Sequence, residues 1–380
     1  MFLIYHISPI STHPITKLFK IFLKRQGVRR STSQHALERA PESDHQRTPL
    51  PKFIQLEVAT LVNSVPPGNE WLHEIKFDGY RILCRVEDGE ARFLTREAQD
   101  WTHRFKGLVK VAGELSAHQL FLDGEIVALD ANGVNDFQLL QNSLKQNSSA
   151  NLVYYIFDLL HLDGRDLTSK PLLARKEELR NILPPHRRST TGPALCSSEY
   201  WIGRGEELFH KACTMGLEGI VSKRKDEPYR TGRGKDWLKI KCVKSQEFVI
   251  GGFTDPAGSR ANLGALLLGV YDNGKFHYAG RVGTGFNSKT LRDLRGRLDR
   301  IESNSPSFVN PPRGADARGV HWVKPDLVCE IAFSGWTSDG LLRHPSFKGL
   351  REDKPAGQVK REIAAATPNS RADHVSSRKR

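Results

Sequence analysis

The chain has 380 residues, 26% of them charged, and a formal net charge of +14 at pH 7. No apolar run approaches the roughly 20 residues that a membrane-spanning helix requires, so we expect no membrane-embedded segment. The five cysteines are odd in number and form no CxxC pair, which indicates neither a zinc ribbon nor a disulfide framework and predicts a reduced, intracellular protein. The basic excess alone does not establish DNA binding, because residues 1–50 and 356–380 supply +5 and +4 of it, and basic tails are commonly only solvated.

The first 50 residues contain a basic amphipathic run, ITKLFKIFLKRQ, followed by a polar stretch punctuated by prolines. The start, MFLIYHISPISTHP, lacks the charged, apolar and small-residue regions that follow one another in a secretory signal. We therefore expect residues 1–50 to form a flexible basic extension.

Residues 51–244 mix strand patterns with helical ones. The strand candidates RILCRV and ARFLT are separated by EDGE, where Asp88 and Gly89 fit a tight hairpin turn. Further strand candidates are FLDGEIVALD, NLVYYIFDLLHL, EGIVSK and WLKIKC, and the helical stretches are NDFQLLQNSLKQ, LLARKEELRNIL and GEELFHKACTMG. This mixture predicts an α+β domain with mixed antiparallel sheets.

Residues 245–355 contain few helical patterns. The segments EFVIGGF, GALLLGVYDNGKFHYAGRVG and DLVCEIAFSGWT are typical of strands, with a hairpin turn at Asn273 and Gly274, and SKTLRDLRGRL is typical of a helix. About five strands with one helix predict an all-β domain of the OB-fold barrel type. We expect the domain boundary near residue 244 and a basic, disordered tail over residues 356–380.

One lysine, Lys76, lies inside the strand-like stretch WLHEIKFDGYR. A lysine is a nucleophile only as the free amine, and lowering its usual pKa of about 10.4 by about three units costs about 4 kcal/mol, which desolvation and neighbouring positive charge can supply. The alternative is a surface lysine paired with Asp78 or Glu74. Local pattern alone favours that alternative.

Four other segments shift the balance toward a reactive lysine. Lys239 and Lys241 are two residues apart in a strand, so their side chains lie on one face. Glu125 and Glu218 each accompany a strand, and Phe157 is an aromatic residue within an apolar strand. An amine that attacks a nucleoside triphosphate needs a stacking aromatic, cations around the phosphates and carboxylates that hold a divalent metal. No GxxxxGK[ST] phosphate-binding loop occurs.

The segment KFDGYR is similar to the KxDGxR signature of the covalent nucleotidyltransferases, which comprise DNA ligases, RNA ligases and mRNA-capping enzymes. The later segments follow in the order of that superfamily, over roughly residues 52 to 355. WLHEIKFDGYR, GRGKDWLKIKC and RHPSFKGLREDKPA most resemble the ligase domain of the bacterial ATP-dependent end-joining DNA ligases. The resemblance implies a nucleotidyltransferase domain, comparable to an ATP-grasp-like ligase domain, followed by an OB-fold barrel.

The resemblance also implies roles for individual residues. Lys76 would form a phosphoramidate with AMP, Phe157 would stack on adenine, and Glu218 would help to bind Mg²⁺ or Mn²⁺. Glu125 would contact the ribose or the metal. The remaining residues implied to bind the ATP are Glu74, Arg81, Arg233, Lys239 and Lys241.

Two further segments carry nucleotide-binding arginines in the family. Arg96 would hold the nucleotide or a DNA 5′-phosphate, but relatives commonly have Arg-Asn-Gly where this chain has Arg96, Glu97 and Ala98. For the last motif, LLRHPSFKGLREDK, the resemblance implies that three residues bind the triphosphate and orient the leaving pyrophosphate. They are Arg343, Arg351 and Lys354.

The sequence thus predicts an ATP-dependent DNA ligase that works in three steps: adenylylation of Lys76, transfer of AMP to a DNA 5′-phosphate, and attack by a 3′-hydroxyl. The alternatives are an RNA ligase or mRNA-capping enzyme with the same lysine chemistry, and a non-catalytic DNA end-binding protein. We expect nicked or broken duplex DNA as substrate, bound mostly through phosphates, and Ku as a partner in double-strand-break repair. We also expect a monomer that is cytoplasmic and associated with the bacterial nucleoid.

Overall fold

The first domain is built on two β-sheets. The structure, a computed structural model, describes residues 48–131, 133–149, 151–183, 193–256 and 262–368. The larger sheet has the strand order β4-β3-β5-β6-β7 with β8 beside β6, and the smaller sheet has the order β1-β11-β10-β2-β9. The larger sheet consists of β3 (Tyr80–Glu87), β4 (Glu90–Thr95), β5 (Gln119–Ala128), β6 (Leu152–Leu162), β7 (Arg165–Asp166) and β8 (Ala194–Ser197). The smaller sheet consists of β1 (Glu57–Leu61), β2 (Trp71–Lys76), β9 (Tyr200–Ile202), β10 (Gly219–Arg224) and β11 (Gly232–Lys241).

Most neighbouring strands in both sheets are antiparallel, while β1 with β11 and β6 with β8 are parallel, which confirms the predicted mixed sheets. The hairpin between β3 and β4 turns at Asp88 and Gly89, with φ of +48° and +84°, as expected for a tight turn. The two sheets pack together through Leu83 and Phe121 of the larger sheet and Trp237 of the smaller one.

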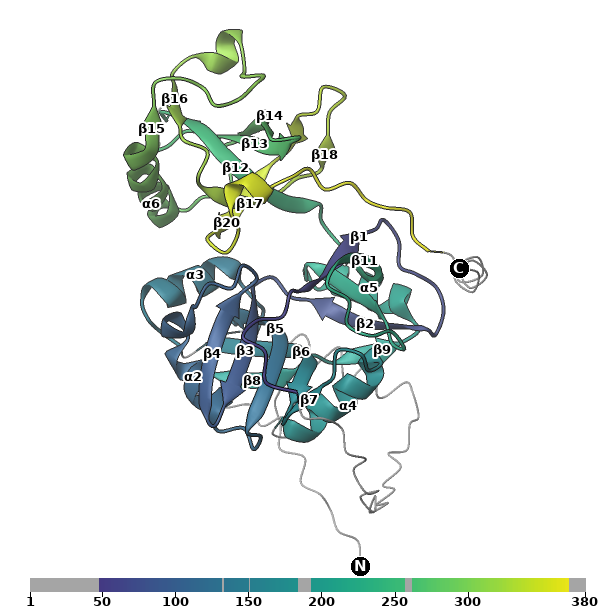
Figure 1. The fold of residues 1–380 in the computed structure, drawn as a ribbon. Helices are drawn as coiled ribbons and strands as arrows, with labels where there is room; N and C mark the ends of the chain where they lie inside the picture. The colour runs from purple at the N-terminus through teal and green to yellow at the C-terminus, as the bar shows by residue number, and fades with distance from the viewer. Residues whose placement is uncertain (1–47, 132, 150, 184–192, 257–261, 369–380) are drawn as a thin grey trace, which may run out of the picture.

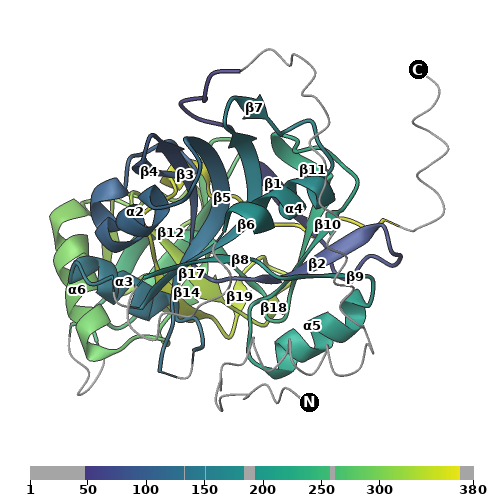
Figure 2. The same cartoon turned by 90° about the horizontal axis from the view of Figure 1, so that it is seen from below.

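In the described part of the first domain, four helices cover the outer faces of these sheets (Figure 2). They are α2 (Lys106–Gly113), α3 (Phe137–Lys145), α4 (Leu172–Ile182) and α5 (Gly205–Thr214). The sequence predicts α3, α4 and α5 but not α2. Asp136 caps α3 by accepting a hydrogen bond from the Leu139 amide, and α5 ends just before Gly216 at φ +71°. On the smaller sheet, Leu238 and Ile240 pack under α5, so that Lys239 and Lys241 face the opposite way.

The second domain is an OB-like β-domain that begins at β12 (Figure 1). Its main sheet contains β14-β13-β12 with β17 and β20 beyond β12, and β16 and β15 extend another edge. The elements are β12 (Ser245–Thr254), β13 (Leu266–Asp272), β14 (Lys275–Val282), α6 (Ser288–Leu298), β15 (Glu302–Ser303), β16 (Val320–Val323), β17 (Val328–Ala332), β18 (Gly335–Trp336), β19 (Leu342–Arg343) and β20 (Ser346–Arg351). The predicted hairpin turn at Asn273 and Gly274 and the predicted helix α6 are both confirmed.

The two domains touch through α3 of the first and β20 of the second. Gln141 donates a hydrogen bond of 2.5 Å to the Leu350 carbonyl, and Arg351 Nη1 donates one of 3.1 Å to the Gly79 carbonyl. The second bond reaches the turn directly after Lys76. The last strand of the second domain therefore lies at the edge of the Lys76 region.

The C-terminal segment differs from the sequence-based expectation. Residues 356–368 do not continue as a disordered tail but cross from the second domain to β1 of the first, where the Ala365 amide donates to the Leu61 carbonyl. The segment forms hydrogen bonds with both domains along this path. Its basic composition gives no indication of these contacts. The expectations for residues 1–47 and 369–380 lie outside the described residues.

The cysteine expectation also needs correction. Cys213 at the C-terminal end of α5 and Cys242 just after β11 form a disulfide, with 5.2 Å between their Cα atoms. An odd cysteine count does not prevent a single bridge, and the fold brings together two residues 29 positions apart. Among the described residues, no helix is both long enough and apolar enough to cross a membrane.

Candidate active site

Lys76 lies at the end of β2, which runs between β10 and β9 in the smaller sheet. It is paired with Gly219 of β10, and Gly219 is paired in turn with Lys241 of β11. The residue before Gly219 is Glu218, and its Oε2 lies 2.6 Å from Lys76 Nζ. Both side chains are largely buried, with 21% and 15% of their surface exposed. The partner of Lys76 is therefore Glu218, and neither Asp78 nor Glu74 holds it at the surface.

A cavity of about 150 Å³ opens over Lys76, and we call it the Lys76 cavity. Nine of the residues singled out from the sequence line it. They are Lys76, Arg96, Glu125, Glu218, Arg233, Lys239, Lys241, Arg351 and Lys354. Both domains contribute to the wall, since Arg351 and Lys354 follow β17 in the second domain. Residues spread over more than 250 positions thus form one site, lined by seven cations and six carboxylates.

Several cations of the Lys76 cavity are paired with carboxylates of the same chain. Lys239 Nζ lies 2.5 Å from Glu362 Oε1, and Lys241 Nζ lies 3.5 Å from Glu218 Oε1 and 4.0 Å from Glu330 Oε1. Lys354 pairs with Glu247 of β12. The sequence reasoning missed the three carboxylates Glu247, Glu330 and Glu362. They reach the cavity only through the docking of the second domain and of the C-terminal segment, for which no local signal exists.

The two predicted metal-binding carboxylates of the cavity, Glu125 and Glu218, differ in pKa. Burial raises the pKa of Glu125 to about 7, although Lys76, Arg351 and Arg81 counteract this rise. Burial would also raise the pKa of Glu218, but the charges of Lys76 and Lys241 prevail and lower it below the usual value. Near neutral pH, Glu218 is therefore ionised, while Glu125 changes its charge.

Lys239 and Lys241 of β11 also differ from each other in pKa. Burial lowers the pKa of Lys239 to about 8, and the neighbouring charge of Lys241 acts in the same direction. The pKa of Lys241 is raised despite its burial, because Glu218 and Glu330 stabilise its charged form. Lys241 therefore provides a permanent positive charge beside Glu218.

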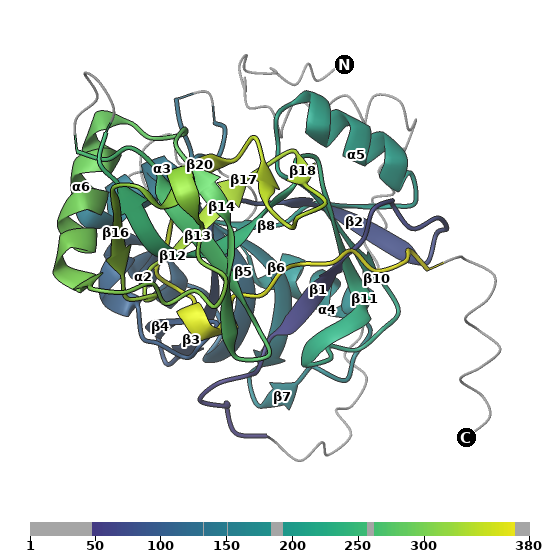
Figure 3. The same ribbon diagram turned by 90° about the horizontal axis from the view of Figure 1, so that it is seen from above.

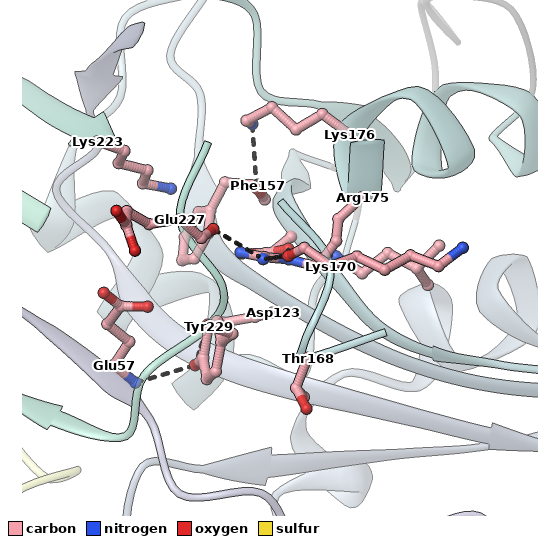
Figure 4. A network of polar contacts seen from close by, with 12 residues as sticks. Glu57, Asp123, Phe157, Thr168, Lys170, Arg175, Lys176, Lys223, Glu227 and Tyr229 are labelled. Atoms are coloured by element: carbon pink, nitrogen blue, oxygen red, sulfur yellow. Dashed lines mark hydrogen bonds and ion pairs between the residues drawn. The ribbon is translucent and has the colours of Figure 1, made fainter. Parts of the chain in front are cut away.

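Three predicted nucleotide-binding residues do not line the Lys76 cavity but belong to a buried network between the sheets (Figure 4). Glu74 pairs with Lys176 and Lys223, with 2.7 Å to Lys223 Nζ. Lys223 Nζ lies 4.2 Å from the centre of the Phe157 ring. Arg81 is held by Asp123 through two hydrogen bonds of 3.0 and 2.7 Å, and its guanidinium lies 5.3 Å from the same ring.

This network also contains residues that sequence reasoning did not single out. Tyr229 donates a hydrogen bond of 2.8 Å to Asp123 and accepts one of 3.0 Å from the Glu57 amide. Burial raises the pKa of Glu57 to about 7 and lowers that of Lys223 to about 8. Phe157 therefore lies at the edge of a buried cluster of charged groups, and two cations cover its ring.

The segment of Arg96, Glu97 and Ala98 forms a strained loop after β4. Ala98 has φ of +60°, a left-handed conformation that glycine adopts without strain and alanine does not. Arg96 lies 3.6 Å from Glu97, and Gln358 of the C-terminal segment donates a hydrogen bond of 3.3 Å to the same carboxylate. Glu97 thus connects the predicted phosphate-binding arginine to the C-terminal segment.

Arg343 is the remaining predicted nucleotide-binding residue, and it lies away from the Lys76 cavity. It is exposed in β19, whose pairing with β18 forms a short hairpin. The family motif that suggested Arg343 is contiguous in sequence, but the chain turns between Arg343 and Arg351, so only the second of these arginines reaches the cavity.

Two family models match the chain. The model described as ATP dependent DNA ligase domain matches residues 52–241, and the one described as ATP dependent DNA ligase C terminal region matches residues 259–354. Together they cover both domains.

Curated proteins are also similar to this chain in sequence. The multifunctional non-homologous end joining protein LigD of Pseudomonas aeruginosa is 40% identical over 325 residues, which cover 85% of this chain and 38% of that protein. The multifunctional non-homologous end joining DNA repair protein LigD of Mycobacterium tuberculosis is 37% identical over 297 residues, 78% of this chain and 38% of that protein. The chain thus spans 38% of the length of these two relatives.

Among solved structures, mycobacterial DNA ligase D complexed with ATP and MES is similar, with a TM-score of 0.58 and 34% sequence identity. The match covers 80% of this chain and 98% of that one.

Proposed function

Because the chain belongs to the ATP-dependent DNA ligase family, we propose that it seals 5′-phosphate and 3′-hydroxyl breaks in duplex DNA through a lysyl-AMP formed on Lys76. The observation that carries this proposal is the Lys76 cavity. It places one largely buried lysine beside Glu218 and surrounds it with six further cations, which are Arg96, Arg233, Lys239, Lys241, Arg351 and Lys354.

In the first step, Lys76 Nζ bonds to the α-phosphorus of ATP while the bond from that phosphorus to the oxygen of the β-phosphate breaks, and pyrophosphate leaves. Glu218 takes up the proton that Lys76 gives up, because its Oε2 is already the hydrogen-bond partner of the amine. Lys239 and Lys241 neutralise the charge that develops on the phosphates. Arg351 and Lys354 from the second domain orient the leaving pyrophosphate in line with the amine.

Glu125 and Glu218 are the carboxylates that would hold Mg²⁺ or Mn²⁺. No group of three histidines, cysteines or acidic residues among the described residues is arranged to bind a metal by itself. Mg²⁺ commonly binds through one or two carboxylates together with substrate phosphates and water, so this donor set fits such an ion. When bound, the ion would withdraw charge from the reacting phosphates.

Phe157, Arg81 and Glu74 would form the base and ribose end of the nucleotide site. Glu74 lies on β2, two residues before Lys76, while Arg81 of β3 and Phe157 of β6 belong to the buried network between the two sheets. Figure 4 shows Phe157 in that network. For adenine to stack on Phe157, Lys223 has to move off the ring that it now covers.

In the second and third steps, AMP passes to a DNA 5′-phosphate and a 3′-hydroxyl then displaces it. Arg96 and the exposed hairpin that carries Arg343 would face the DNA backbone. The second domain would move about the hinge near Val243 to Gln246, where the Val243 side chain is 59% exposed and little packed.

The decisive experiment incubates the purified chain with α-labelled ATP and magnesium and then measures the covalent label and the sealing of nicked duplex DNA. Lys76→Ala should abolish both signals, whereas Lys275→Ala, at an exposed position of β14, should retain them. A wild-type chain that takes no label refutes the proposal. Labelling from GTP would instead identify a capping-type enzyme. Preferential sealing of single-stranded RNA would identify an RNA ligase, and DNA binding without sealing would identify a non-catalytic end-binding protein.

We further propose that this activity serves non-homologous end joining, the process for which both LigD relatives are named. The chain would then act as a monomer on broken DNA in the bacterial cytoplasm, associated with the nucleoid and recruited by Ku. A pull-down with Ku on linear DNA tests the partnership, and a Ku-independent rate of end sealing refutes it.

A further inference from the structure

The C-terminal strap, which we define as residues 356–368, is held at both ends. At its start, Val359 is 1% exposed in the core of the second domain, and its carbonyl accepts a hydrogen bond of 2.7 Å from the Tyr271 amide. Near its end, Ala365 bonds to Leu61, and Thr367 Oγ1 donates to the Ser64 carbonyl at 3.2 Å. Figures 1 and 3 show this yellow segment crossing from the second domain to the region of β1.

Between these two anchors, the strap directs one acidic side chain into the Lys76 cavity. Glu362 Oε1 lies 2.5 Å from Lys239 Nζ, and the Glu362 amide donates a hydrogen bond of 3.1 Å to Gln246 at the hinge. Its other oxygen, Oε2, is buried and has no hydrogen-bond partner among the residues that the structure describes. The Glu362 carboxylate therefore lies among cations, with Oε1 paired to Lys239 and Oε2 without a hydrogen bond to any described residue.

The same strap residue separates two cavities. A second cavity of about 290 Å³ adjoins the first and shares Arg233, Lys354 and Glu362 with it. Two cations of the strap, Lys360 and Arg361, complete its wall. Glu362 is thus the acidic group at the junction of two cation-lined spaces, at the end of the site where Arg233 and Lys354 would meet phosphates.

A carboxylate that pairs with Lys239 occupies a position that a phosphate oxygen would otherwise take. We propose that the strap is an intramolecular competitor of the nucleotide, in which Glu362 neutralises Lys239 until the triphosphate displaces it. The inference rests on the proposed adenylylation at Lys76 and adds a regulatory element to that site. Burial would raise the pKa of Glu362, but Lys239 and Lys241 lower it, so the carboxylate is ionised when it competes with ATP.

A second contact of the strap, at Glu97, fits this role. Gln358 of the strap donates to Glu97, whose carboxylate also lies near Arg96. The strap therefore takes part in two carboxylate–cation pairs at the cavity. It contributes Glu362 to the pair with Lys239, and its Gln358 contacts the pair of Glu97 and Arg96. Its release would free Lys239 and loosen the contact to Glu97 together.

The test compares the full chain with Glu362→Gln, which keeps the size of the side chain and removes its charge. We expect the ATP concentration for half-maximal labelling of Lys76 to fall about fivefold or more, with little change in the maximal rate. Ile363→Ala is the matched control, because this neighbouring side chain is 80% exposed and should leave the ATP dependence unchanged. An unchanged half-saturating concentration in Glu362→Gln overturns the proposal. An increased one overturns it as well, because Glu362 would then position Lys239 for the reaction.

A second measurement separates this inference from the proposed chemistry. Calorimetric titration of ATP into Lys76→Ala and into Lys76→Ala with Glu362→Gln reports binding without any covalent step. Tighter binding in the double variant supports the competing strap even if the wild-type chain takes no label. Equal binding in the two variants overturns it, whatever the activity of the wild type.

Discussion

Lys76 Nζ and Glu218 Oε2 lie 2.6 Å apart, although 142 positions separate the two residues in the sequence. They meet because β2 and β10 are antiparallel neighbours in the smaller sheet, with Lys76 opposite Gly219. Glu218 also faces Lys241 from the next strand. A single carboxylate therefore links the proposed nucleophile to the cation row of β11.

Glu218→Gln should slow labelling of Lys76 by about a hundredfold, because in the proposed mechanism Glu218 accepts the proton of the amine and would be a charged ligand of Mg²⁺ or Mn²⁺. The rate of label incorporation at saturating ATP and magnesium measures this effect. Glu206→Gln on the exposed side of α5 serves as the control and should match the wild type. A Glu218→Gln rate within threefold of the wild type, as an approximate limit, would remove this residue from the mechanism.

Lys354→Ala should impair the first step and spare the last. Lys354 reaches the Lys76 cavity from the second domain and pairs there with Glu247, so its proposed role is to hold the leaving pyrophosphate. Labelling of Lys76 should fall about tenfold or more, whereas the sealing of a nick that already carries 5′-adenylate should remain close to the wild-type rate. Equal losses in both assays would show that Lys354 acts on DNA rather than on ATP.

The sequence predicted the parts of the site that local pattern and motif spacing determine. Alternation in WLKIKC places Lys239 and Lys241 on one face, and the structure has them opposite the apolar face under α5. The capped, periodic segment SKTLRDLRGRL likewise forms α6 over the predicted residues, because Asn287 accepts a hydrogen bond from the Thr290 amide.

The remaining features depend on how distant segments dock. Glu362 lies in a stretch whose composition predicts disorder, and only its anchors on Tyr271 and Leu61 bring it to Lys239. Arg343 shows the converse, since it belongs to a recognisable motif but lies on an exposed hairpin outside the Lys76 cavity. A motif specifies the order of residue types, whereas the direction in which a hairpin points depends on tertiary packing.

Glu57→Gln should stabilise the protein more at pH 8 than at pH 5. Burial raises the folded-state pKa of Glu57 from 4.5 to about 7, so its ionisation opposes folding, and the penalty grows as the pH rises from the unfolded to the folded pKa. The glutamine is neutral at both pH values and avoids this penalty. The gain in the free energy of unfolding should increase by about 3 kcal/mol between pH 5 and pH 8, since each pKa unit corresponds to about 1.4 kcal/mol. Urea titrations of both proteins at the two pH values measure it, and a gain independent of pH contradicts the assignment.

Ala98→Gly should raise the stability of the loop after β4. A left-handed backbone costs alanine about 1–2 kcal/mol more than glycine, and the greater freedom of glycine in the unfolded chain returns part of that gain. We therefore expect a net increase of about 0.5–1 kcal/mol in the free energy of unfolding. Ala366→Gly is the matched control, because φ is not positive at that exposed position, and it should not stabilise the protein. Destabilisation by Ala98→Gly would contradict the strained loop.

Reduction of the bridge between Cys213 and Cys242 should destabilise the first domain. The bridge closes a loop of 29 residues between the end of α5 and the end of β11, and a loop of this length corresponds to about 3.6 kcal/mol of unfolded-state entropy. Urea titrations with and without a thiol reductant should differ by about this amount in the wild type. Cys213→Ser should remove the dependence on reductant, whereas Cys196→Ser, which leaves the bridge intact, should keep it. Equal stability of the wild type under both conditions would show that the bridge does not form in solution.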